Sequence, residues 1–234
     1  MATFQTAYER LMRTINRPTS ETDVLQGAKD AINDAILFLQ RNHGYAYTQI
    51  VLDVPITAST FSVNLATALA SPVRDVQAFY QVSASGVRQG KPLKVITFAK
   101  LQAMRMHYDR THTSGDEVTW MNESLTGWTI EDAYRSDKIA FLYGNVIGVY
   151  PTPTESANFV LFGHAWLPAL SAASDTNFFL DYALDVVLTI ALKRMHLYLK
   201  LDSRFAVTEQ EVSDLLAGLV NWDAQILTGN NNSL

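Results

Sequence analysis

The sequence contains no cysteine in its 234 residues. Disulfides, thiolate-bound metals and cysteine nucleophiles are therefore excluded, and packing and oligomerisation must supply the stability. The sequence also lacks the glycine patterns GxGxxG and GxSxG and any phosphate loop, so nucleotide binding and acyl transfer have no support. Its five histidines include neither an HExxH motif nor a helical pair four residues apart. We expect no metal ion, no cofactor and no catalytic residue.

An excess of positive charge is also missing, because 18 lysines and arginines face 23 aspartates and glutamates and leave a formal charge of −5. This balance argues against a protein that grips nucleic acid through its phosphates. The most apolar run, residues 178–201, is interrupted by charged residues that include Asp181, Asp185, Lys193 and Arg194. Each would cost roughly 2.5 to 3.5 kcal/mol at the centre of a bilayer. Residues 1–15 alternate apolar and charged residues and do not form a signal peptide. We expect no membrane contact and a protein that stays in the cytoplasm where it is made.

Hydrophobic residues make up 48% of the chain, which is ample for a packed core. In residues 4–16 the apolar side chains recur three and four positions apart, which predicts a short helix. A broad apolar stripe predicts a second helix over residues 21–41. We expect Gly44 to end this helix in the left-handed conformation.

The middle of the chain has the patterns of strands. Three β-type stretches lie between residues 45 and 82, and a polar tip follows at 83–90. Thr97 is a plausible N-cap for one helix near 97–110. The aromatic residues between 117 and 134 indicate short strands or an ordered loop.

Two short apolar strands, 138–143 and 146–150, are separated only by Gly144 and Asn145. This two-residue link suits a tight turn and predicts a β-hairpin. Two prolines then end the second strand, and residues 156–167 resume as a third. We expect a three-stranded meander, around which the rest of the chain is organised.

Two long helices are predicted at the end of the chain. Residues 178–199 are apolar on nearly every side, which indicates one central buried helix. Thr208 and Glu211 have the spacing of a capping box for a last helix over 208–227. The predicted fold class is α+β: a bundle of the N-terminal and C-terminal helices carries a β-rich lobe inserted in the middle of the chain. The corresponding domains are a helical core of residues 1–44 and 171–234, and a β-rich lobe of residues 45–170 that contains the helix near 97–110.

Two pairs of neighbouring carboxylates leave an alternative open. Asp116-Glu117 and Glu131-Asp132 are flanked by Trp120 and Trp128, and paired carboxylates beside aromatic rings occur in glycoside hydrolases. The alternative function is therefore a carbohydrate-active enzyme or a glycan-binding module. We favour solvated turn residues beside packed aromatic rings, and hence a protein that is not an enzyme.

The arrangement resembles a known family, the head-to-tail adaptor proteins of tailed bacteriophages, which are neck or head-completion ring components beneath the portal. Three features carry the resemblance. The first is an N-terminal helical pair that ends in the aromatic patch RNHGYAYTQ. The second is a hairpin with YGN at its turn, whose second strand ends in PTP and is followed by a strand that leads into LPAL. The helix pair FFLDYALDVVLTIALKRMHLYL and TEQEVSDLLAGLVNWDAQIL closes the chain.

The resemblance implies a structural virion protein in the neck of the tail. Such proteins form homo-oligomeric rings, usually of twelve copies, that contact the portal ring and the tail or nozzle proteins. DNA would pass through the channel during ejection without sequence-specific binding, which suits the negative charge. Aromatic residues near the helix ends exceed what one helix face needs, as at a subunit interface. The predicted portal or subunit interface comprises Phe178, Phe179, Tyr198 and Trp222, together with a C-terminal docking arm of Gly229, Asn230, Asn231, Asn232, Ser233 and Leu234.

Overall fold

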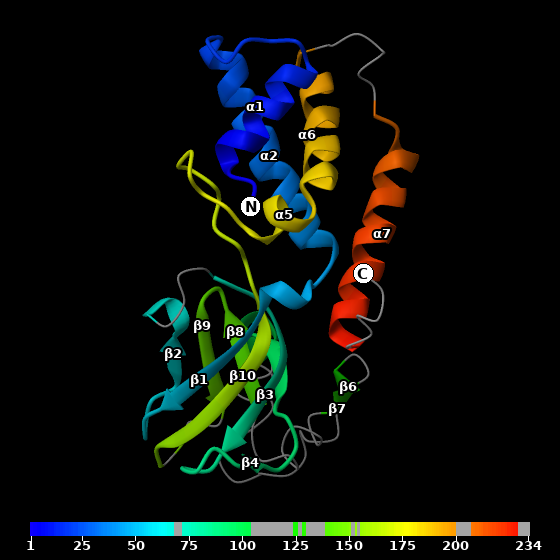
Figure 1. The fold of residues 1–234 in the computed structure, drawn as a ribbon. Helices are drawn as coiled ribbons and strands as arrows, with labels where there is room; N and C mark the ends of the chain where they lie inside the picture. The colour runs from blue at the N-terminus through cyan, green and yellow to red at the C-terminus, as the bar shows by residue number, and fades with distance from the viewer. Residues whose placement is uncertain are drawn as a thin grey trace. The chain divides into compact units, whose positions relative to one another are not determined.

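The computed structural model describes residues 1–67, 72–103, 124–125, 128–129, 139–150, 153, 155–199 and 207–228. The chain divides into two units, a helical unit formed by Met1–Thr48 and Leu167–Leu234 and a strand unit formed by Gln49–Trp166 (Figure 1). Each unit has its own hydrophobic core. The helical unit contains every interface residue predicted from the sequence.

The first two helices of the helical unit agree with the sequence prediction. Helix α1 spans Phe4–Thr14 and is capped by the Thr3 hydroxyl, which accepts the Thr6 N–H at 3.2 Å. Helix α2 spans Thr22–Asn42 and buries the stripe that includes Ala28, Ile32 and Leu39. It ends because the next residue, His43, has extended backbone (φ −146°, ψ 149°). The expected left-handed glycine stop is therefore wrong, although the position of the helix end is confirmed.

The apolar run after residue 177 forms two helices where one was predicted. Helix α5 spans Phe178–Tyr182 and helix α6 spans Leu184–Leu199, with a break at Ala183 (φ −136°, ψ 29°). Asn177 caps α5, since its side-chain oxygen accepts the Leu180 N–H at 3.1 Å. The single central helix is therefore wrong, although most of its apolar residues do enter the core.

The last helix, α7, spans Glu209–Thr228, and its predicted capping box is confirmed. The Glu211 N–H donates to the Thr208 hydroxyl at 3.1 Å, and the Thr208 N–H donates to the Glu211 carboxylate at 2.7 Å. The Thr208 N–H and the Thr208 hydroxyl both donate to the Glu211 carboxylate and hold its pKa below the usual value. Two of the backbone donors that a helix N-terminus leaves without intrahelical acceptors are thus satisfied.

The predicted helical bundle is wrong, although a strand-rich region does occupy the middle of the chain. A bundle needs long helices that run side by side and share a continuous apolar seam. Here α1 has 11 residues and α5 only five, and the break at Ala183 shortens α6. Of the apolar side chains described on α7, only Val212 and Leu219 are buried. The helices therefore share one core to which they contribute unequally, and α7 packs at the edge of that core (Figure 1).

The strand unit contains two four-stranded sheets that share a core. The first sheet has the order β1-β10-β3-β4, with all neighbours antiparallel. The second has the order β2-β9-β8-β5, in which only β5 and β8 run parallel. Phe79 and Phe159 of the first sheet stack at 5.0 Å inside the shared core. The strands of the two sheets are β1 (Gln49–Ile56), β10 (Ala157–Ala165), β3 (Val73–Val82), β4 (Arg88–Gln89), β2 (Ser62–Asn64), β9 (Val146–Tyr150), β8 (Ile139–Tyr143) and β5 (Lys94–Thr97).

The predicted hairpin is confirmed, but the meander is wrong. Strands β8 and β9 pair around a turn in which Gly144 has φ +55°, a conformation that favours glycine. Strand β10 does not continue beside β9; it pairs with β1 on one side and β3 on the other. Consecutive strands are usually neighbours, and here the chain crosses to the other sheet instead.

The remaining elements are short. Two 3-10 turns, η1 (Ala46–Thr48) and η2 (Leu65–Thr67), flank the first strands, and β6 (Ser124–Leu125) pairs with β7 (Trp128–Thr129). Helical backbone starts at residue 98 and continues to 103, and the rest of the helix expected near 97–110 lies outside the described residues. Most of the region from 117 to 134, for which we expected short strands or an ordered loop, also lies outside them.

Candidate interaction surface on the helical unit

The segment between α2 and β1 is joined to α7 by one buried carboxylate. Asp223 is completely buried, and it accepts the Ala46 N–H at 2.9 Å and pairs with Nε2 of His43 at 3.0 Å. A carboxylate out of water is costly unless hydrogen bonds and an ionic partner compensate it. These two contacts therefore fix the C-terminal half of α7 against the segment that follows α2.

Tyr45 lies beside this anchor. Its ring is fully buried and makes edge contacts with His43 at 4.7 Å and Phe179 at 5.0 Å. Burial raises the pKa of the Tyr45 hydroxyl to about 12, and the negative charge of Asp223 adds to the increase. The hydroxyl has no hydrogen-bond partner among the described residues. Tyr45 therefore stays neutral and forms part of the floor under the neighbouring aromatic residues.

Four aromatic rings pack together at the surface around Phe178, and we call this cluster the aromatic row: Tyr47, Phe178, Trp222 and Tyr182. Tyr47 stacks on Phe178 at 4.7 Å and 14°, and Phe178 stacks on Trp222 at 5.7 Å and 21°. Tyr182 packs on both Trp222, at 5.8 Å, and Phe178, at 5.3 Å. Phe178 is buried, but Tyr47 and Tyr182 are 58% and 66% exposed. The row thus has a buried phenylalanine at its centre and two exposed tyrosines around it.

A cleft opens beside the aromatic row, between α5–α6 and α7. It has a volume of about 340 Å³, and it is lined mainly by apolar side chains such as Val186, Leu215 and Trp222, with Asp214 at its edge. A Cβ added at Gly218 would meet no other atom within 4 Å, so this part of the cleft is open. Exposed aromatic rings next to an apolar cleft are typical of protein interfaces.

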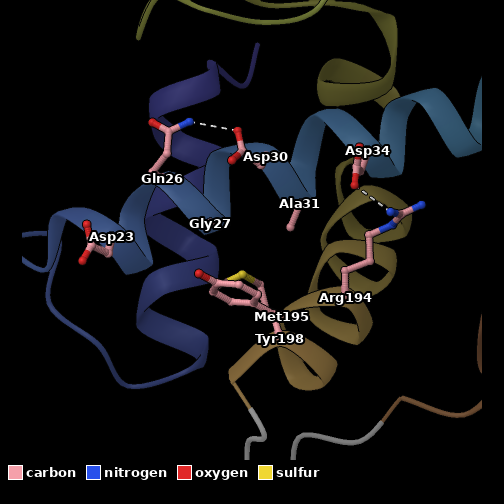
Figure 2. A pocket seen from close by; sticks show the side chains of 9 residues that line it. All are labelled: Asp23, Gln26, Gly27, Asp30, Ala31, Asp34, Arg194, Met195 and Tyr198. Carbon is pink, nitrogen blue, oxygen red and sulfur yellow. Dashed lines mark hydrogen bonds and ion pairs between the residues drawn. The ribbon is translucent and has the colours of Figure 1, made fainter.

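A second hollow, the α2–α6 groove, has a volume of about 510 Å³ (Figure 2). Its floor includes Ala31, Met195 and Gly27. A Cβ added at Gly27 would lie 3.4 Å from the Tyr198 ring. Tyr198 is 68% exposed. The groove is also lined by three carboxylates of α2. Among the described residues, only Asp34 of these three has a cationic partner, since Arg194 lies 2.7 Å away. The lining carboxylates are Asp23, Asp30 and Asp34.

The structure brings some of the predicted interface residues together and separates others. Phe178 and Trp222 meet in the aromatic row, whereas Phe179 is fully buried beneath it. Tyr198 lines the separate α2–α6 groove. The predicted arm, residues 229–234, lies outside the described residues.

Sequence reasoning missed the residues that organise this surface. Tyr47 lies in the quoted aromatic patch but was not assigned to the interface. Asp223 lies four residues after Leu219, on the buried face of α7, and a carboxylate in an apolar stripe is a signal that it has a partner. The partners, His43 and Ala46, are far away in the sequence, so that signal alone does not identify them.

The described residues give no support to the enzymatic alternative. Within them there is no group of three or more side chains that could hold a metal ion. The carboxylate pairs Asp116-Glu117 and Glu131-Asp132 and the ring of Trp120 lie outside the described residues, and Trp128 is described only as a residue of β7. No helix in the described part of the chain is long and apolar enough to cross a membrane.

The chain matches a known protein family. The family model described as SU10 adaptor protein matches residues 2–231. No curated protein matches the chain. The family match confirms the resemblance to phage head-to-tail adaptors that was drawn from the sequence.

Proposed function

The chain belongs to the SU10 adaptor protein family, and from this we propose that it forms a ring between the portal and the tail of a phage particle. An adaptor of this family is a phage structural protein that contacts other components of the virion. The finer role proposed here is that of a head-to-tail connector in the neck. The observation that supports it most directly is the aromatic row on the helical unit.

The aromatic row has the chemistry of a protein interface. Tyrosine and tryptophan supply large, stiff contact surfaces, and they are enriched at the centre of interfaces. The two exposed tyrosines of the row both pack on the buried Phe178, and the apolar cleft lies alongside. A neighbouring protein that covers the row would remove these rings from water without reordering them, because stacking already holds them in place.

A ring also explains why one copy should need two different contact surfaces. In a closed ring each subunit uses one face for the preceding neighbour and another for the next. We assign the α2–α6 groove of the helical unit to one of these faces and the separate cleft beside the aromatic row to the portal. We take twelve as the number of copies, as the resemblance implies, and the portal ring as the template for assembly.

The remaining parts of the proposal concern orientation and DNA. We assign the helices to the portal side and the β-strands to the outer side or to the tail and nozzle proteins. Residues 229–234 are proposed as an arm that becomes ordered on the portal. A net charge of −5 suits a conduit for ejected DNA, because like charges provide no counterion-release gain that would hold the DNA in place.

The proposal is tested by assembly of the purified protein on the portal ring of the same phage, followed by light scattering. We expect a stable complex for the natural sequence and a weaker one for Tyr182→Ser. The matched control is Tyr143→Ser, because Tyr143 is 67% exposed but lies on β8 in the strand unit. Failure of the natural sequence to associate would contradict the function. Equal effects of the two substitutions would remove the aromatic row from the interface.

A further inference from the structure

The α2–α6 groove combines an open apolar floor with unpaired negative charge. Asp23 and Asp30 are exposed on α2, and neither has a cationic partner among the described residues. Gln26 donates to Asp30 at 2.8 Å, which leaves the charge in place. On the α6 side the Tyr198 ring is exposed (Figure 2). A partner that fits this groove should carry positive charge together with a small apolar group.

One stretch of this same chain has that composition. Residues 76–103 contain four lysines and arginines and no aspartate or glutamate, although the chain as a whole is acidic. Within this stretch lies a turn that we call the basic turn, residues 83–91. Val87, which follows residues 84–86 of the turn, is 64% exposed, and it precedes Arg88 and the exposed Lys91. Lys91 has no ionic partner among the described residues.

The basic turn is held in one shape by its own hydrogen bonds. The Ser83 N–H donates to the Val87 carbonyl at 2.8 Å, and the Val87 N–H donates to the Ser83 hydroxyl at 3.1 Å. Gly86 and Gly90 have φ of +77° and +74°, which a glycine adopts without strain. A preformed turn loses little conformational freedom when it binds.

We propose that the α2–α6 groove of one copy receives the basic turn of the next copy in the ring. Val87 would contact the apolar floor, and Lys91 would approach Asp23 and Asp30. The contact joins two different surfaces, which is the kind of contact that generates rings. The inference depends on the proposed function, since it names the partner of the groove that contains Tyr198.

A second copy explains both surfaces better than nucleic acid does. The carboxylates of the groove would repel a phosphate backbone, so DNA would account for the basic turn alone. The complementary charges should guide the encounter of two copies and make assembly sensitive to salt.

The experiment uses reversed charges in the full-length protein, with assembly on the portal ring as the readout. Asp30→Lys and Lys91→Glu should each weaken the contact between copies by about threefold to tenfold, because one attraction becomes a repulsion. The double variant should restore assembly. So should an equal mixture of the two single variants, because an alternating ring then pairs opposite charges at every contact. Asp53→Lys, which alters an exposed carboxylate of β1, should have no effect.

Each alternative outcome contradicts the inference in a recognisable way. Normal assembly of both single variants would place the contact elsewhere and leave the adaptor function intact. Weak single variants that neither the double variant nor the mixture restores would assign the groove to another virion protein. If the Lys91→Glu protein assembled normally but the resulting particles retained less DNA than those with the natural sequence, the basic turn would be assigned to DNA binding. Failure of the natural sequence to assemble would instead contradict the proposed function itself.

Discussion

Replacing Asp223 by alanine should detach the C-terminal half of α7 from the helical unit. The substitution leaves the Ala46 N–H without its acceptor and removes the hydrogen-bond partner of His43 Nε2. Each hydrogen bond to a charged group contributes about 1.5 to 3 kcal/mol. We therefore expect a loss of about 3 kcal/mol in the free energy of unfolding of the helical unit.

This magnitude can be measured by urea and thermal unfolding. For a chain of this size about 1 kcal/mol corresponds to a shift of about 2 to 4 °C in Tm, so Asp223→Ala should lower Tm by roughly 6 to 12 °C. Asp223→Asn keeps an acceptor for the Ala46 N–H and should lose less. Near-ultraviolet circular dichroism should also change, because Trp222 of the aromatic row is the preceding residue.

The matched control is Asp214→Ala. Asp214 also lies on α7, but it is exposed, and its one hydrogen bond within the described part of the chain comes from Gln210 at 2.7 Å. Its loss should stay within about 0.5 kcal/mol, as for an ordinary surface substitution. If Asp223→Ala were no more destabilising than Asp214→Ala, the buried carboxylate would not anchor α7, and this reasoning would be refuted.

Two further predictions concern glycine and pH. Gly163→Ala should lower the free energy of unfolding by about 1 to 3 kcal/mol, because the added Cβ would overlap the backbone carbonyl of Asp75. The control is Gly218→Ala, whose Cβ would meet no atom, so this substitution should be neutral or stabilising. Urea unfolding measures both. Burial raises the pKa of Asp75, but hydrogen bonds from His164 and Arg74 outweigh it and lower that pKa overall. A lowered pKa stabilises the fold above the unfolded value near 3.9, and this contribution is lost as pH falls through the folded pKa. The stability advantage of the natural protein over Asp75→Asn should therefore be present at pH 7 and shrink below pH 4, and a constant difference would contradict this origin.

The features that could be predicted from the sequence are those that neighbouring residues determine. The capping box of α7 depends on residues three positions apart, and the hairpin depends on Gly144 within a two-residue turn. The stripe of α2 likewise follows from its own spacing. In each case the hydrogen bonds or buried face belong to one continuous segment, so a local pattern is sufficient.

The features that could not be predicted depend on distant partners. The sequence around Ala183 has no glycine or proline, and α5 separates from α6 where its rings pack on Tyr45 and Tyr47. Strand β10 looks like a continuation of the hairpin, but its partners are β1 and β3. The interface residues illustrate the same limit. The surplus of aromatic residues was visible, but which rings stack and which are buried depends on the packing of α7.

The mass of the purified protein with and without the portal ring tests the central claim most directly. Twelve copies of 26.1 kDa would add about 313 kDa to the portal ring in light scattering. Our account predicts a stoichiometric gain of this size, whether or not the free protein is already assembled. No gain in mass at any salt concentration would contradict the adaptor function.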